Sequence, residues 1–68
     1  MTLNEYYQRY ETILNMPIGM IEKDKMLSSL MTDLERAFHI PMVKNENWQK
    51  EHPDVYALYV KVSESRSF

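Results

Sequence analysis

The chain has 68 residues, of which 44% are hydrophobic and 26% charged, and it contains no cysteine. This length predicts one domain over residues 1–68, and the absence of cysteine excludes stabilisation by a disulfide. The formal net charge is −2 and no segment collects positive charge, which removes the electrostatic basis for non-specific phosphate binding. No apolar run approaches the ~20 residues of a membrane-spanning helix, and no signal peptide is visible, so we expect a cytoplasmic protein with no membrane contact.

The first predicted helix covers residues 3–15. Thr2 is a good N-cap residue, and Glu5 three positions later completes a capping box. An apolar stripe with helical spacing follows, made of Leu3, Tyr6, Tyr7, Tyr10, Ile13 and Leu14. Pro17 and Gly19 then interrupt the pattern, which predicts a short connection between two antiparallel helices.

The second predicted helix covers residues 20–39 and is the longest periodic segment. Its apolar residues fall within roughly a third of the helix circumference: Leu27, Leu30, Met31, Leu34 and Phe38. Pro41 ends this helix, because proline disfavours the helical conformation in the residue before it. If the helix begins at Met20, Lys23 lies on the apolar stripe. Either Lys23 then extends its ammonium group along the stripe to solvent, or the regular helix begins near Glu22.

A polar loop is predicted over residues 41–52, and it contains the single tryptophan, Trp48. Asn45 or Asn47 is suited to cap a single helical turn over residues 48–50. A tryptophan in such a loop usually anchors the loop by burying its ring against the core.

The third predicted helix covers residues 53–65. Pro53 suits the first helical position and Asp54 the first turn. Residues 55–62 are also rich in β-branched and aromatic side chains, so a strand is the alternative. Helix is favoured because a lone strand needs a pairing partner, and the chain offers only the short 42–43 piece. A helical apolar stripe supports this choice: Val55, Leu58, Tyr59 and Val62.

These segments predict an all-α fold, a small three-helix up-down-up bundle. Its helices lie near residues 3–15, 20–39 and 53–65, and the tryptophan-containing loop joins the second helix to the third. The predicted core collects the apolar residues of the three stripes: Leu3, Tyr7, Tyr10, Leu14, Leu27, Leu30, Met31, Leu34, Phe38, Val55, Leu58, Tyr59 and Val62.

No constellation for catalysis or metal binding is visible in the sequence. The two histidines, His39 and His52, are 13 positions apart, and a zinc site needs three or four ligands at workable spacing. The serines at 28–29 lack a neighbouring base, and paired carboxylates such as Asp33 and Glu35 point apart on a helix. We therefore expect no catalytic, cofactor-binding or metal-binding residues, no small-molecule substrate and no enzymatic activity.

The third helix has a second apolar strip. Tyr56 and Val60 are i, i+4 neighbours flanked by Ala57, and they lie roughly 100–140° from the main stripe. Either the Trp48 loop folds back over this strip, or the strip meets another chain. The candidate protein interface is therefore Trp48, Tyr56, Ala57 and Val60. A two-fold contact through the strip would make a homodimer.

Two classes of function are compatible with these features. The first is a small non-enzymatic protein–protein interaction module, such as a regulator or inhibitor of a larger cellular protein. The alternative is a small nucleic-acid-binding domain of helix-turn-helix type. The first is favoured, because the chain is acidic and its third predicted helix region contains only Lys61 and Arg66 as bases. No motif names the protein partner.

Overall fold

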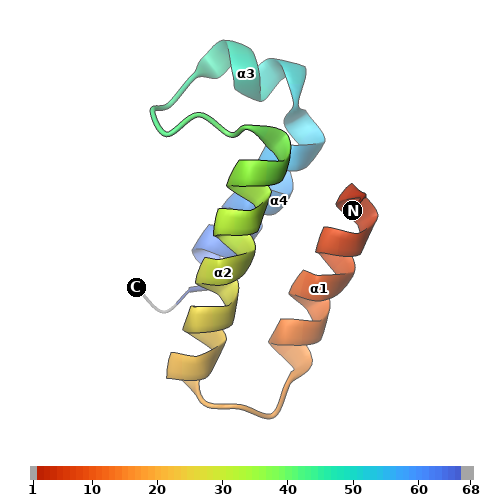
Figure 1. Cartoon of the computed structure of the whole chain (residues 1–68), viewed down its shortest axis with the longest axis vertical. Helices are drawn as coiled ribbons and strands as arrows, with labels where there is room; N and C mark the ends of the chain where they lie inside the picture. The colour runs from red at the N-terminus through yellow and green to blue at the C-terminus, as the bar shows by residue number, and fades with distance from the viewer. Residues whose placement is uncertain (1, 67–68) are drawn as a thin grey trace.

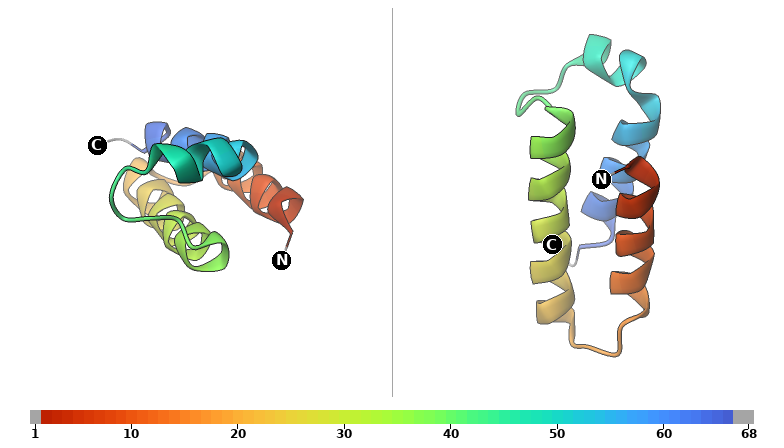
Figure 2. Two further views of the ribbon diagram at one scale, coloured as in Figure 1. Left: turned by 90° about the horizontal axis from the view of Figure 1, so that it is seen from above. Right: turned by 45° about the vertical axis from the view of Figure 1, so that its right-hand side comes forward.

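The computed structural model describes residues 2–66 and contains four helices. They are α1 (Leu3–Asn15), α2 (Met20–Phe38), α3 (Glu46–Glu51) and α4 (Pro53–Glu64), and the described residues contain no strand. The three longer helices alternate in direction, with α1 and α2 side by side and joined at the lower end in Figure 1. In Figure 2, α4 lies behind this pair. The short α3 crosses the end of the bundle that is opposite the α1–α2 connection.

Helix α1 begins where the sequence predicts. The Glu5 backbone N–H donates to Thr2 Oγ1 at 3.3 Å, and the Thr2 backbone N–H donates to Glu5 Oε1 at 3.3 Å. Both halves of the capping box are thus formed, which satisfies two backbone donors that a helix start leaves open. The helix ends at Asn15, as predicted, and the extended residue Met16 leads to Pro17.

Helix α2 extends back to Met20, which resolves the position of Lys23. The Lys23 ammonium is not simply directed to solvent: it donates to the backbone carbonyl of Leu14 at 2.9 Å. The carbonyl end of a helix carries partial negative charge, so this contact fastens the end of α1 to the beginning of α2. The next residue, Asp24, is 6% exposed, a burial that the apolar pattern does not predict.

The end of α2 turns sharply. His39 adopts the left-handed conformation, with φ 54° and ψ 47°. The Ile40 N–H donates to the Glu35 carbonyl at 3.1 Å, which closes the last turn. The helix thus stops at Phe38, one residue short of the prediction, and the left-handed residue directs the chain across the end of the bundle.

The connection predicted as a loop over residues 41–52 is partly helical, so the described residues form four helices rather than three. Of the two possible caps, Asn45 is the one used: its side-chain oxygen accepts from the Trp48 N–H at 3.0 Å. Pro53 occupies the start of α4, as predicted. Residues 55–62 lie within α4, so the helical interpretation is confirmed over the strand alternative.

The core lies where the three longer helices meet. Its buried members come from α1 (Tyr6, Ile13), α2 (Leu27, Leu30, Leu34) and α4 (Leu58, Val62). Val55 of α4 is also buried, and Leu3, Tyr7, Tyr10, Met31, Phe38 and Tyr59 are partly buried against the core. The predicted core is therefore correct for most of its members.

One predicted core residue is wrong: Leu14 is 38% exposed, whereas its neighbour Ile13 is 2% exposed. The Arg9 guanidinium binds the Asp33 carboxylate of α2 at 2.6 Å. The Arg9 side of α1 thus faces α2. Tyr6 and Ile13 then occupy the centre of the buried face, and Leu14 lies at its edge.

Candidate functional site

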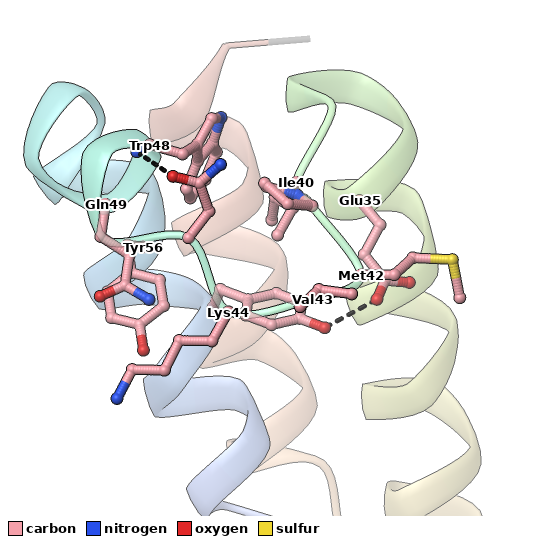
Figure 3. A pocket seen from close by; sticks show the side chains of 11 residues that line it. Glu35, Ile40, Met42, Val43, Lys44, Trp48, Gln49 and Tyr56 are labelled. Atoms are coloured by element: carbon pink, nitrogen blue, oxygen red, sulfur yellow. Dashed lines mark hydrogen bonds between the residues drawn. The ribbon is translucent and has the colours of Figure 1, made fainter.

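A groove opens at the α3 end of the bundle, and we call it the α3 groove. Its volume is about 340 Å³. Its walls are mainly apolar: Ile40, Met42, Val43, Trp48, Tyr56 and Tyr59. Polar groups complete the lining: Glu35, Lys44, Asn45 and Gln49, with the ring of Pro41. Figure 3 shows these side chains arranged around the space between α2, α3 and α4.

Trp48 reaches the groove because α3 is held at a fixed angle by its cap. The Asn45 cap orients the first turn of α3, and Trp48 then lies one turn before His52. The Trp48 and Tyr56 rings meet edge to face, with centroids 6.5 Å apart and planes at 79°. The His52 ring covers another part of Trp48, with centroids 4.9 Å apart. These ring contacts fasten α3 to the first turns of α4.

Tyr59 and Glu35 join the two long walls of the groove. The Tyr59 hydroxyl of α4 donates to Glu35 Oε2 of α2 at 2.7 Å. Burial, the hydrogen bond to the Glu35 carboxylate and the charge of that carboxylate raise the pKa of Tyr59 to about 12. The phenol is therefore protonated at neutral pH and acts as a hydrogen-bond donor, not as a base.

Two apolar side chains at the rim of the groove are exposed to solvent and do not pack in the core. Met42 is 100% exposed and Val43 is 79% exposed. In Figure 3 the Met42 side chain extends beside Glu35 and away from Trp48 and Tyr56. Adjacent exposed apolar side chains that border an apolar groove are typical of a protein contact surface.

The structure brings together two of the four candidate interface residues predicted from the sequence. Trp48 and Tyr56 are in contact and both line the α3 groove. Ala57 is exposed and Val60 is half-buried, and neither is among the residues that line the groove. Self-association through the strip of Tyr56, Ala57 and Val60 stays a prediction.

Sequence reasoning missed most of the groove. Glu35 and Tyr59 meet only because α2 packs against α4, and the turn at His39 brings Ile40 and the residues after it to the same space. A signal for the rim was present: Met42 and Val43 are consecutive apolar residues inside an otherwise polar connection.

Over residues 2–66, no three histidine, aspartate or glutamate side chains gather closely enough to hold a metal ion. No helix in the described part of the chain combines the length and hydropathy of a bilayer span. Comparisons with models of protein families, with curated proteins and with solved structures found no significant match. Function is therefore inferred from the α3 groove and its residues.

Proposed function

We propose that this protein is a small non-enzymatic protein–protein interaction module of the cytoplasm, a regulator or inhibitor of a larger protein. In this proposal the up-down-up bundle is the scaffold and the α3 groove is the contact surface. The observation that carries the proposal is the groove itself: about 340 Å³ lined mainly by apolar and aromatic side chains, with the fully exposed Met42 at its rim.

The size and chemistry of the groove suit an apolar anchor from a protein partner. Its volume lies at the lower end of the range of about 300–1,000 Å³ that ligand pockets occupy. Interfaces commonly place one large aromatic or aliphatic side chain in such a pocket. Burying about 200 Å² of that side chain would contribute about 5 kcal/mol before the costs of association.

Two local features give the groove a defined shape before a partner arrives. Trp48 is fixed by the Asn45 cap and by its contact with Tyr56. The Tyr59–Glu35 hydrogen bond of 2.7 Å sets the spacing of α4 and α2. A contact surface that is already ordered loses less conformational entropy on binding, so more of the apolar burial appears as affinity.

The nucleic-acid alternative has less support. A helix-turn-helix reader needs bases that reach phosphates or base edges. The Lys61 ammonium of α4 lies over the Tyr7 ring, 5.8 Å from its centroid, and Arg66 Nη1 lies 3.6 Å from Met31 Sδ. Both bases are thus directed toward neighbouring helices, and the net charge of the chain is −2.

Site-specific photo-cross-linking in the native cell tests this proposal. A photoreactive phenylalanine analogue at position 43 reports on the groove rim, and the same analogue at position 21 is the control. Ile21 is 72% exposed and belongs to the first turn of α2, at the opposite end of the bundle. We expect a discrete adduct between position 43 and a different, larger protein, and no such adduct from position 21.

The adduct must also depend on the shape of the groove. Trp48→Ala removes one wall, and circular dichroism checks that the chain keeps its helices. We expect this variant to lose the adduct, and to bind the purified partner at least about tenfold more weakly. Equal adducts from positions 43 and 21, or an adduct unaffected by Trp48→Ala, would contradict the proposal.

A further inference from the structure

We infer that a second copy of this chain fills the α3 groove, in a two-fold dimer where each copy inserts its Met42–Val43 rim into the groove of the other. The inference rests on the groove of the proposed function and names one occupant for it. The dimer contact then lies at the α3 end of the bundle and not on the strip of Tyr56, Ala57 and Val60.

The first argument is geometric. A two-fold contact uses the same patch of both copies, so the patch must contain both a protrusion and the hollow that receives it. Met42 and Val43 are the protrusion, 100% and 79% exposed, and they border the hollow of about 340 Å³. Figure 3 shows the Met42 side chain directed away from Trp48 and Tyr56, so it does not fill its own groove. It is free to reach a neighbouring molecule.

The same patch contains one positive and one negative side chain, Lys44 and Glu35. Lys44 follows Val43 on the rim and lines the groove together with Glu35. Glu35 engages Tyr59 through Oε2, and a carboxylate can accept further donors. When the rim of one copy enters the groove of the other, Lys44 comes beside the partner's Glu35, and symmetry forms this pair twice. Exposed pairs of this kind add little affinity, but they fix the register of an interface.

A chain of this size has little apolar surface to leave exposed to solvent. A 68-residue chain without cysteine has a small core. Its connection between α2 and α3 nevertheless exposes two adjacent apolar side chains. Reciprocal insertion covers both side chains and both grooves at once, whereas an unrelated peptide in the groove leaves Met42 and Val43 at its edge. A consequence is that self-association and binding of another protein at the groove are mutually exclusive.

Sedimentation equilibrium of the full chain tests the inference. We expect the parent chain to dimerise with a dissociation constant in the micromolar range, which is typical of a small interface. Met42→Glu should raise this constant at least about tenfold, because it places a carboxylate in a mainly apolar groove that already contains Glu35. Met20→Glu is the matched control, since Met20 is 68% exposed at the other end of the bundle, and it should change the constant less than about twofold.

Cross-linking gives the register independently, because the chain has no cysteine of its own. Val43→Cys and Gln49→Cys place thiols on the rim and on the wall of the groove. A mixture of the two variants should form a mixed disulfide dimer under mild oxidation. Ile21→Cys mixed with Gln49→Cys should not form one.

Three results would overturn the inference. The first is a parent chain that stays monomeric up to about 500 μM. The second is a dimer that Val60→Glu dissociates and Met42→Glu does not, which would assign the contact to the α4 strip. The third is a mixed disulfide that forms equally with the position-21 control. If the chain is monomeric but still gives a groove-dependent adduct with another protein, only the dimer is overturned. If the chain dimerises but gives no adduct with another protein, only the proposed function is overturned.

Discussion

Replacing Tyr59 by phenylalanine removes one hydroxyl group and keeps the ring that lines the α3 groove. That hydroxyl donates to Glu35 Oε2 at 2.7 Å and connects α4 to α2. A hydrogen bond to a charged group contributes about 1.5–3 kcal/mol when it is buried. Because both side chains are half-buried, we expect Tyr59→Phe to lower the free energy of unfolding by about 1–2 kcal/mol at neutral pH.

The same contact has a defined pH dependence. Burial, followed by the hydrogen bond to Glu35 and its charge, raises the pKa of Tyr59 from its ordinary value of 10.0 to about 12. A group whose pKa is raised by folding contributes stability that is fully present below its unfolded pKa and is lost as the pH rises through its folded pKa. The contribution of Tyr59 is therefore constant below pH 10 and disappears between about pH 10 and 12.

Urea denaturation followed by circular dichroism, at several values from about pH 8 to 11.5, measures this contribution. The stability gap between the parent and Tyr59→Phe should be widest near pH 8 and should narrow above pH 10. Tyr7→Phe is the control, because the Tyr7 hydroxyl makes no hydrogen bond to another described residue, and it should change stability by less than about 0.5 kcal/mol. A Tyr59→Phe variant as stable as the parent at pH 8, or a gap that stays constant to pH 11.5, would refute the reasoning.

Three further stability predictions follow from the fold and are checked by the same denaturation assay. Leu30→Ala should lower the free energy of unfolding by about 2–5 kcal/mol, because Leu30 is 0% exposed; Leu14→Ala, at 38% exposure, should cost less than about 1 kcal/mol. His39→Gly should stabilise the chain by about 0.5–1 kcal/mol, because φ is 54° there and a left-handed conformation strains a residue with a Cβ. Gly19→Ser should add a few tenths of a kcal/mol, because Gly19 is the N-cap of α2 and an added Cβ meets nothing within 4 Å. A destabilised variant at position 39 or 19 would show that the local backbone is not as described.

The helix boundaries were predictable because the signals that set them are local. The Thr2–Glu5 capping box needs four consecutive residues and is formed as predicted. The start of α4 depends on Pro53 alone, because the fixed φ and missing N–H of proline suit the first helical position. The periodic apolar stripe of α2 similarly identified Leu30 and Leu34 as core residues, and both are 0% exposed.

The orientation of α1 was less predictable, because it depends on a contact between distant residues. Six apolar residues share a broad arc of α1, and the sequence does not say which part of the arc faces inward. The Arg9–Asp33 ion pair joins positions 24 residues apart and marks the side of α1 that faces α2. In this orientation Ile13 is buried and Leu14 exposed, although both belong to the same predicted stripe.

The groove was predictable only in part. One of the two alternatives from the sequence is that the Trp48 connection folds back over Tyr56 and Val60, and the Trp48 and Tyr56 ring centroids do lie 6.5 Å apart. The wall formed by residues 40–45 follows from the left-handed turn at His39, and the wall of Glu35 and Tyr59 from the packing of α2 against α4. Glycine or asparagine would have signalled such a turn, whereas histidine does not. The path of the chain after α2, and with it the position of Met42, therefore had no clear signature in the sequence.

The central claim is that the α3 groove is where another protein chain docks, with a second copy of this chain as the occupant. A dilution series of amide NMR spectra, from about 1 mM to 20 μM, tests it directly. The single tryptophan gives one indole N–H signal, from the wall of the groove. We predict that this signal and the backbone amides of residues 42–49 shift together with concentration, while the amides of the α1–α2 connection stay constant. Spectra that do not change on dilution would contradict the claim. So would shifts confined to the α1–α2 connection, or to Ala57 and Val60 of α4.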